Sequence, residues 1–386
     1  MNSITHRAKW VLISPEQIIE NGFVTVSGGR IVASGRGRGP KGTRKKDHGP
    51  GMLMPALVNA HTHLDLTALD GAPLPDSDFL SWVRGVITGK AALTKEEILA
   101  GILKGQEFLW QSGCILAGDH RSFSLETPFS ENPFIHVFHE YLGTKFPPIV
   151  PASNGASSSL AAHAPHTTAP RLILDLKQRC RQKNLVFSMH VAESPEEMEF
   201  ITTAGGTWAE FLESRGISFE MWGLPAPSPI RHLDHLGVLD SRTLAIHLVQ
   251  TDRDDLKILA RKGVRVCVCP RSNRNLLDQL PDVHAMVDWG LRPALGTDSL
   301  ASVSSLDLFD EMRFLVREVP DLSPADIIAM GTVNGARALD REKELGTLEP
   351  GKRAVMLFLP VDGANSEAAI AKLLSGDFQV SPEWVL

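Results

Sequence analysis

The middle of the chain repeats one pattern, in which a short apolar run precedes a polar segment with apolar residues at helical spacing. Segments 94–113 and 251–263 have this helical spacing, and Thr94 and Thr251 precede acidic residues, where helix N-caps are expected. Eight such units over about 280 residues predict a (β/α)8 barrel of TIM type. The eight apolar runs are LVNAHTH, CILAGDH, FIHVFHEYLG, LAAHAPHT, LVFSMHVAE, LAIHLVQ, VRVCVCPRSN and LRPALGTDS.

An open, doubly wound sheet would show the same alternation of strands and helices. Nucleotide-binding sheets of that kind carry a glycine-rich phosphate motif directly after the first strand. No such motif follows the run at 57–63. The barrel is therefore the preferred fold, and we expect it to span residues 55–344.

The two ends of the chain have a different pattern. Residues 8–36 alternate apolar and polar positions, with Gly28 and Gly29 where a hairpin turn is expected, and residues 354–360 form another strand-like run. Both stretches lie outside the repeated region. We expect residues 1–54 and 345–386 to form one small composite β-sandwich domain.

Charge and composition exclude several classes of function. The formal net charge is −6 and the only short basic stretch, residues 35–46, is glycine-rich and typical of a solvated loop. Nothing therefore indicates binding to nucleic acid or to an anionic membrane. A small-molecule substrate fits better, and a homo-oligomer stays open.

The four cysteines are too few for a disulfide framework, and Cys267 and Cys269 are expected to pack in the core. The N-terminus lacks the charged and apolar regions of a signal peptide, and no run of eighteen apolar residues occurs. These features predict a cytoplasmic protein.

Polar residues recur where the predicted strands end. His61 and His63 end the first run, and because residues i and i+2 of a strand point to the same side, both imidazoles should face the barrel mouth. In a (β/α)8 barrel the chemistry lies at these carboxyl ends. The other residues of this kind are His163, His190, His247 and Asp298.

Imidazole nitrogens and a carboxylate oxygen together suit a borderline divalent ion, so the set predicts one metal ion, Zn²⁺ or alternatively Fe²⁺. Glu193 follows His190 by three residues and could reach a metal-bound water without being a ligand. The alternative is that Glu193 only serves the dipole at the start of a helix.

Five segments carry a resemblance to a known family. The chain resembles the amidohydrolase superfamily, and within it the deaminases of adenosylhomocysteine, methylthioadenosine and related nucleosides. The segments are VNAHTHLDL, HAPHT, HVAE, CPRSNRNL and LGTDSLASVSSLDLFDEMR.

The resemblance implies a role for each site residue. Asp298 would bind the metal and would accept a proton from the hydrolytic water. Glu193 would pass that proton to the substrate ring, and His247 would orient the water and the developing alkoxide. Two-metal relatives carry a bridging lysine at the end of the fourth strand, which SSLAAHAPHT lacks, so a single metal is implied. The implied ligands are His61, His63, His190 and Asp298.

The substrate is less firmly implied. Adenosylhomocysteine deaminases bind ribose through a glutamate that segment 79–93 lacks, and DFLSWVRGVI instead resembles the aminodeoxyfutalosine deaminases of menaquinone biosynthesis. Trp82 could stack on a base or be a core aromatic, and Arg84 could meet a carboxylate or lie on the surface. By analogy, His163 contacts the substrate's sugar.

Other functions on the same scaffold stay open. An adenosylhomocysteine, methylthioadenosine or guanine-type deaminase, or a chlorohydrolase, would use the same metal site. A non-catalytic amidohydrolase-like protein would have lost its ligands, which this chain keeps. Four further residues near the predicted mouth have no assigned role: His120, His139, Glu140 and His166.

Overall fold

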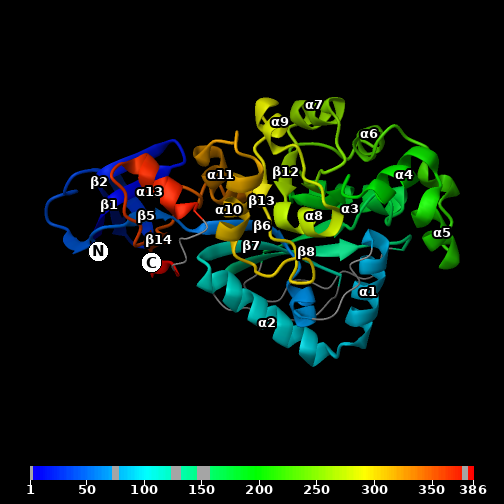
Figure 1. The fold of residues 1–386 in the computed structure, drawn as a ribbon, viewed down its shortest axis with the longest axis horizontal. Helices are drawn as coiled ribbons and strands as arrows, with labels where there is room; N and C mark the ends of the chain where they lie inside the picture. Colours follow the sequence, from blue (N-terminus) through cyan, green and yellow to red (C-terminus); the bar gives the residue numbers. More distant parts are fainter. Residues whose placement is uncertain (1–2, 72–77, 123–131, 146–156, 376–380) are drawn as a thin grey trace.

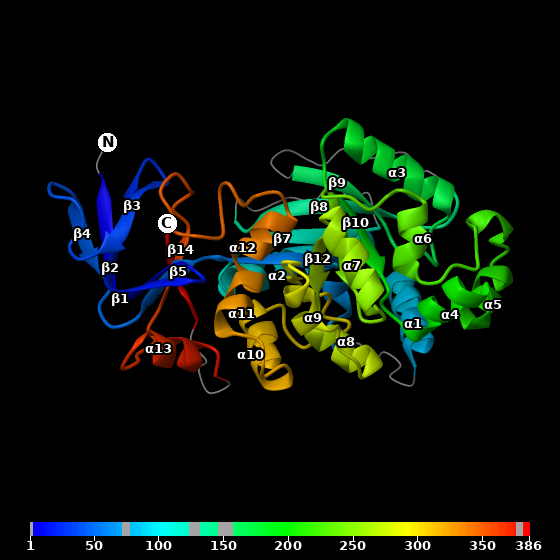
Figure 2. The ribbon, with the colours of Figure 1, turned by 90° about the horizontal axis from the view of Figure 1, so that it is seen from above.

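The computed structural model describes residues 3–71, 78–122, 132–145, 157–375 and 381–386. Figures 1 and 2 show two bodies, a sheet at one side that contains both chain ends and a larger α/β body beside it. The larger body holds the repeated region, and the smaller one holds the stretches before and after it.

The larger body is built on eight parallel strands in consecutive order, so each strand pairs with its neighbours along the chain. All eight apolar runs of the sequence form these strands, which confirms the predicted barrel. The strands are β6 (Leu57–Thr62), β7 (Cys114–Arg121), β8 (Phe134–Tyr141), β9 (Ser157–Ala162), β10 (Phe187–Val191), β11 (Thr243–His247), β12 (Arg265–Val268) and β13 (Ala294–Leu295).

The sheet closes between its last and first strands through backbone just after β13. The amides of Thr297 and Asp298 donate to the carbonyl oxygen of His61 at 3.0 and 3.2 Å, and Thr62 forms a parallel bridge with Asp298. Asn59 supports this seam from within, because its side-chain oxygen accepts hydrogen bonds from the amides of His61 and Thr297. Closure therefore places Asp298 directly beside His61.

Helices follow most of these strands. They are α1 (Phe79–Ala92), α2 (Lys95–Gln111), α3 (Pro170–Gln182), α4 (Pro195–Thr203), α5 (Gly206–Ser214), α6 (Pro229–His235), α7 (Arg253–Lys262), α8 (Pro270–Leu277), α9 (Val283–Asp288), α10 (Leu308–Glu318), α11 (Pro324–Gly331), α12 (Val333–Ala338) and α13 (Ser366–Leu373), with short 3₁₀ turns η1 (Leu64–Leu69) and η2 (Glu220–Trp222).

One of the two predicted helix caps is confirmed and the other is wrong. Thr94 forms a capping box with Glu97 at the start of α2. Helix α7 begins one residue later than expected, because the Asp252 carboxylate, and not Thr251, accepts the hydrogen bond from the Asp255 amide. The Thr251 hydroxyl instead donates to the carbonyl of Leu248.

The smaller body is a seven-stranded sheet drawn from both chain ends, and the turn at Gly28 and Gly29 forms as expected, with φ values of 58° and 71°. Strand β14 pairs antiparallel with β5, which joins the C-terminal segment to the N-terminal one. The strands are β1 (Ile4–Ser14), β2 (Gln17–Ser27), β3 (Arg30–Arg36), β4 (Arg44–Asp47), β5 (Met52–Pro55), β14 (Met356–Leu359) and β15 (Glu383–Val385).

Both faces of this sheet are buried around its centre. One face packs in the same core cluster as the barrel and α13, and the other has a core of its own. Because side chains alternate along a strand, successive residues of β1 join different cores. Trp10 and Leu12 face the barrel core, while Val11 and Ile13 face the second core.

Candidate metal centre and active site

The carboxyl ends of β6, β10 and β11, with the residues just after β13, bring four histidines and one aspartate together. The ring centroid of His61 lies 4.8 Å from that of His63, 4.9 Å from that of His190 and 5.7 Å from that of His247. Possible ligand atoms of His61, His63 and Asp298 lie within 4.8 Å of one another, as do those of His61, His190 and His247.

A chain of hydrogen bonds fixes the proton on His61. The Ser188 hydroxyl donates to the carbonyl of Leu244 at 3.4 Å, so its oxygen is free to accept from Nε2 of His120 at 2.8 Å. Nδ1 of His120 then accepts from Nδ1 of His61, 3.0 Å away. Nε2 of His61 is therefore an unprotonated lone pair, and it is buried without a hydrogen-bond partner among the described residues.

His63 and His190 are each oriented by a backbone carbonyl. Nδ1 of His63 donates to the carbonyl of His120 at 3.1 Å, and Nδ1 of His190 donates to the carbonyl of His163 at 2.8 Å. Each Nε2 must then be unprotonated, yet these two atoms face each other at 3.3 Å. Two acceptors at that distance repel unless a cation lies between them, which is the arrangement that a metal site requires.

Asp298 supplies the remaining donor. Its Oδ2 atom accepts hydrogen bonds from the hydroxyls of Ser272 at 2.6 Å and Ser302 at 3.1 Å. Its Oδ1 atom lies 3.6 Å from Nε2 of His61 and 3.9 Å from Nε2 of His63. Burial alone would raise the pKa of Asp298, but the neighbouring imidazoles of His61 and His63 hold it well below its usual range, so the carboxylate is ionised.

The donor set fits a divalent ion. Three imidazole lone pairs and one carboxylate oxygen converge, and each ligand's other polar atom is already held by a carbonyl, a second imidazole or a hydroxyl. This combination of nitrogen and oxygen donors with an oriented outer shell is typical of zinc and iron sites in proteins.

The backbone at the strand ends has positive φ angles, which residues other than glycine rarely adopt. Positive φ values occur at Ala192 (53°), His247 (74°), Leu248 (57°) and Asp298 (58°). Such residues cost about 1–3 kcal/mol each and persist only where the surroundings hold them. They follow β10, end β11 and follow β13, which are the strand ends that carry the polar residues.

Glu193 and His247 form a second pair beside the donor set. Oε1 of Glu193 lies 3.4 Å from Nε2 of His247. The Asn273 amide nitrogen donates to Nδ1 of His247 at 3.0 Å, so Nε2 carries the proton and points toward Glu193. Burial, together with the negative charges of Asp298 and Glu197, raises the pKa of Glu193 well above its usual range. This carboxyl is thus suited to holding a proton near neutral pH.

Glu197, which sequence reasoning missed, fixes the position of Glu193. Its side chain is fully buried, and its two oxygens accept hydrogen bonds from the amides of Ala192 at 2.9 Å and Glu193 at 2.8 Å. Glu197 is also the N3 residue of α4, whose N-cap is Ser194. The sequence ESPEE carries a capping signature that could have indicated this role.

Ser272, Ser302 and Asn273 were also missed as individual residues. They lie on α8 and on the loop after β13, within the two motifs CPRSNRNL and LGTDSLAS. They contact the side chains of Asp298 and His247, which lie 26 or fewer positions away in sequence. Ser302 is four residues from Asp298 in the same loop, whereas only the barrel brings α8 to Asp298 and His247, so spacing gives no signal for those two pairs.

Three of the four residues without an assigned role contact the site, and these are His120, Glu140 and His166. His120 orients His61, as described above. Oε1 of the buried Glu140 lies 3.5 Å from Nδ1 of His190 and has no hydrogen-bond partner among the described residues. Nδ1 of His166 lies 3.7 Å from Oε2 of Glu197. His139, on β8, is half-buried, and its Nε2 atom likewise lacks a partner within the described ranges.

The three candidate substrate contacts differ in their surroundings. The ring of His163 lies 5.0 Å from that of His190, and its Nδ1 is hydrogen-bonded to the Thr167 hydroxyl. The indole nitrogen of Trp82 donates to the carbonyl of Ala301, three residues after Asp298. Arg84 is exposed and its guanidinium lies 5.5 Å from the ring centre of Phe211. Their contacts with substrate stay predictions.

A closed parallel barrel with a cluster of imidazoles and a carboxylate at its strand ends is the architecture expected of a metal-dependent hydrolase. This chain belongs to the amidohydrolase family, whose model matches residues 149–380. The protein is thus a hydrolytic enzyme that cleaves C–N bonds. Among the helices that the structure describes, none is both long and apolar enough to cross a membrane.

Three relatives illustrate the likeness. The 5-methylthioadenosine/S-adenosylhomocysteine deaminase of Carboxydothermus hydrogenoformans is 28% identical over 347 residues, covering 81% of this chain and 73% of the relative. The aminodeoxyfutalosine deaminase of Deinococcus radiodurans is 29% identical, covering 82% and 81%. The Helicobacter pylori aminofutalosine deaminase, solved with methylthio-coformycin, has a TM-score of 0.82 at 22% identity, covering 97% and 96%, and so shares the fold.

Proposed function

We propose that this enzyme is a hydrolytic deaminase of an adenine-containing, nucleoside-like compound. The observation that carries the proposal is the pair of Glu193 and His247 beside the metal donors, because deamination needs a proton carrier next to the attacking water. The names of the relatives from Carboxydothermus and Deinococcus support the same reaction.

We propose one Zn²⁺ ion as the resident metal, with Fe²⁺ as the alternative, held by His61, His63, His190 and Asp298. When bound, such an ion lowers the pKa of water to about 7 and makes it a nucleophile at neutral pH. The three Nε2 lone pairs and the free Oδ1 of Asp298 support this assignment.

Three side chains would carry the protons of the reaction. Asp298 takes a proton from the attacking water as its oxygen bonds to C6 of the adenine ring. Glu193 would give its proton to ring nitrogen N1, and His247 would hold the added oxygen by a hydrogen bond from its Nε2–H. The proton that remains on the added oxygen would then pass to the exocyclic amine, the C6–N bond would break, and ammonia would leave with the ring now carrying a carbonyl. The proton held by Asp298 would return to Glu193.

We propose 6-amino-6-deoxyfutalosine, an intermediate of menaquinone biosynthesis, as the substrate. It carries adenine, a ribose and a benzoate carboxylate. His163 would contact the ribose and Trp82 the base, while Arg84 on α1 would pair with the carboxylate, since guanidinium and carboxylate match well. Helix α1 has no glutamate, which weakens the adenosylhomocysteine reading.

The test compares kcat/KM for aminodeoxyfutalosine, adenosylhomocysteine and methylthioadenosine by following ammonia release. We expect aminodeoxyfutalosine to be preferred at least about tenfold over adenosylhomocysteine, a difference of ~1.4 kcal/mol in transition-state binding. Equal or reversed values would exclude the futalosine substrate and leave the deaminase proposal intact. Release of ammonia from none of the three would count against the deaminase proposal itself.

Arg84 gives a narrower test of the substrate. In Arg84→Ala we expect KM for aminodeoxyfutalosine to rise about tenfold, the usual effect of losing a charged hydrogen bond, while methylthioadenosine, which lacks a carboxylate, is unaffected. Arg253→Ala is the matched control, because Arg253 is an exposed arginine at the start of α7. An equal rise for both substrates would show that Arg84 does not read the carboxylate.

A further inference from the structure

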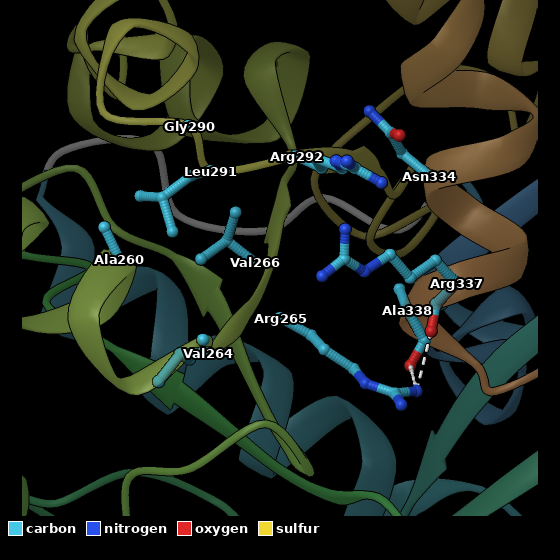
Figure 3. A pocket seen from close by; sticks show the side chains of 11 residues that line it. Ala260, Val264, Arg265, Val266, Gly290, Leu291, Arg292, Asn334, Arg337 and Ala338 are labelled. Carbon is cyan, nitrogen blue, oxygen red and sulfur yellow. Dashed lines mark hydrogen bonds between the residues drawn. The ribbon is translucent and has the colours of Figure 1, made fainter.

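A cavity of about 130 Å³ lies at the amino-terminal ends of β12 and β13, at the opposite end of these strands from the metal donors. Figure 3 shows it between the end of α7, the start of β12 and helix α12. A cavity needs only about 10–15 Å³ of such volume to hold one water, so this one has room for a small polyatomic ligand.

Three arginines line this cavity, and the guanidinium group of one of them already makes hydrogen bonds within the protein. Nη1 of Arg265 donates to the carbonyls of Arg337 and Ala338 at 2.6 and 3.3 Å, and its Nη2 pairs with Asp340 at 2.9 Å. Arg265 thus braces the carboxyl end of α12. It adds positive charge to the cavity but offers few remaining donors.

Arg292 and Arg337 are different. Their guanidinium groups lie near one another beside Asn334 in Figure 3, yet within the described ranges neither makes an ion pair or a side-chain hydrogen bond. Burial, followed by the charges of Arg292 and Arg265, lowers the pKa of Arg337, and the opposing charge of Glu342 is the smallest contribution. Two cations are therefore held close together, and among the described residues neither forms an ion pair with a carboxylate, although the chain as a whole carries a net charge of −6.

The remaining wall is small and apolar, so it does not neutralise the arginines, of which Arg337 is half-buried and Arg292 is exposed. This wall is formed by Ala260, Val264, Val266 and Leu291. Charges that are partly desolvated repel one another more strongly than charges in water. A bound anion would relieve this repulsion, and guanidinium forks match the geometry of carboxylate and phosphate oxygens.

We propose that this cavity is a binding site for a small oxyanion, a phosphate or carboxylate group, gripped by Arg292 and Arg337. The site is separate from the catalytic centre. Arg292 precedes β13 by two residues, and Arg337 lies on α12, so the bound anion ties the strand that leads to Asp298 to the helix that packs behind it. Ligand binding at such a site stabilises the folded state by mass action.

The test uses the metal-loaded full chain, with inorganic phosphate and acetate as probes and ionic strength held constant by sodium chloride. Calorimetry gives the dissociation constant and thermal melting gives Tm. We expect phosphate or acetate to raise Tm of the wild type, and Arg292→Gln and Arg337→Gln each to weaken binding at least about fivefold, as loss of one charged hydrogen bond would. Arg261→Gln, an exposed arginine on the neighbouring helix α7, should bind as the wild type does.

A second readout separates binding from simple structural damage. Without either anion, Arg337→Gln should melt no lower than the wild type, because a repelling charge has been removed. Binding of phosphate alone would identify a phosphoryl ligand and binding of both probes a general oxyanion, and either result supports the site. If neither anion binds at about 10 mM, which means a binding free energy weaker than ~3 kcal/mol, the proposed site is contradicted. Unchanged binding in both variants would also contradict it, as would a change of oligomeric state in Arg292→Gln, which would point to a partner's carboxylate.

Discussion

Each metal donor depends on the group that holds its other polar atom. His63 and His190 donate from Nδ1 to the backbone carbonyls of His120 and His163, so their tautomers are fixed by main chain. His61 depends instead on the side chain of His120. The sequence indicated the candidate ligands through their place at strand ends, but their hydrogen-bond partners lie on or beside other strands and become visible only in the barrel.

Glu193 can be tested by a change that keeps its shape. Glu193→Gln should retain fold and metal but lose turnover by ~10²-fold or more, because an amide cannot pass the proton. Metal content by elemental analysis and steady-state kinetics measure the two properties separately. Glu199→Gln, an exposed residue on the same helix α4, is the control and should behave as the wild type. Near-normal turnover of Glu193→Gln would show that Glu193 only serves the start of the helix.

Glu197 should matter for position and not for proton transfer. In Glu197→Gln one of the two amides, at Ala192 or Glu193, loses its acceptor, which we expect to destabilise the fold by about 1–3 kcal/mol. Turnover should fall because Glu193 is no longer held beside His247. Denaturant unfolding and kinetics check both effects. Loss of turnover with unchanged stability would contradict a purely positional role.

At the scale of elements, the seam between β13 and β6 decides whether the site forms. Strand β13 has only two residues, and the barrel closes through amides that follow it and donate to His61. Gly296 lies in this seam, and a Cβ added there would come within 2.8 Å of both Cβ and the carbonyl oxygen of His61. Only a residue without a side chain allows this approach.

Gly296→Ala should therefore damage the metal site without touching a ligand. We expect overpacking to lower stability by about 1–3 kcal/mol and to weaken metal binding, because His61 and Asp298 move apart. Gly35→Ala in β3 is the control, since its Cβ would make an ordinary contact 3.5 Å from Phe23. Melting curves and metal titration give the result. Normal metal affinity in Gly296→Ala would mean that the seam yields without disturbing the ligands.

Strands and several helix starts could be predicted because their signals are local. The eight apolar runs and the capping box at Thr94 need only neighbouring residues to be read. The cap predicted at Thr251 lies one residue too early, since Thr251 and Asp252 are both good caps and the sequence does not say which side chain accepts from the Asp255 amide. Positive φ values at His247 and Asp298 gave no signal, because neither residue is glycine.

At the scale of the whole molecule, the two chain ends are expected to meet because both have strand-like patterns and both lie outside the repeated strand–helix region. Pairing of β5 with β14 joins them, and the barrel core continues onto one face of their sheet. The arginine cavity could not be foreseen, since Arg265, Arg292 and Arg337 are separated by 27 or more positions and only the barrel brings them together.

The central claim is that one metal ion at the strand ends drives deamination. The most direct measurement removes metal with a chelator, returns Zn²⁺ stepwise, and follows ammonia released from aminodeoxyfutalosine at each addition. We expect no release from the chelated enzyme and a linear rise that saturates at about one equivalent per chain, as a single site with four protein ligands requires. Full activity without metal, saturation only at two equivalents, or no ammonia at any metal level would contradict it.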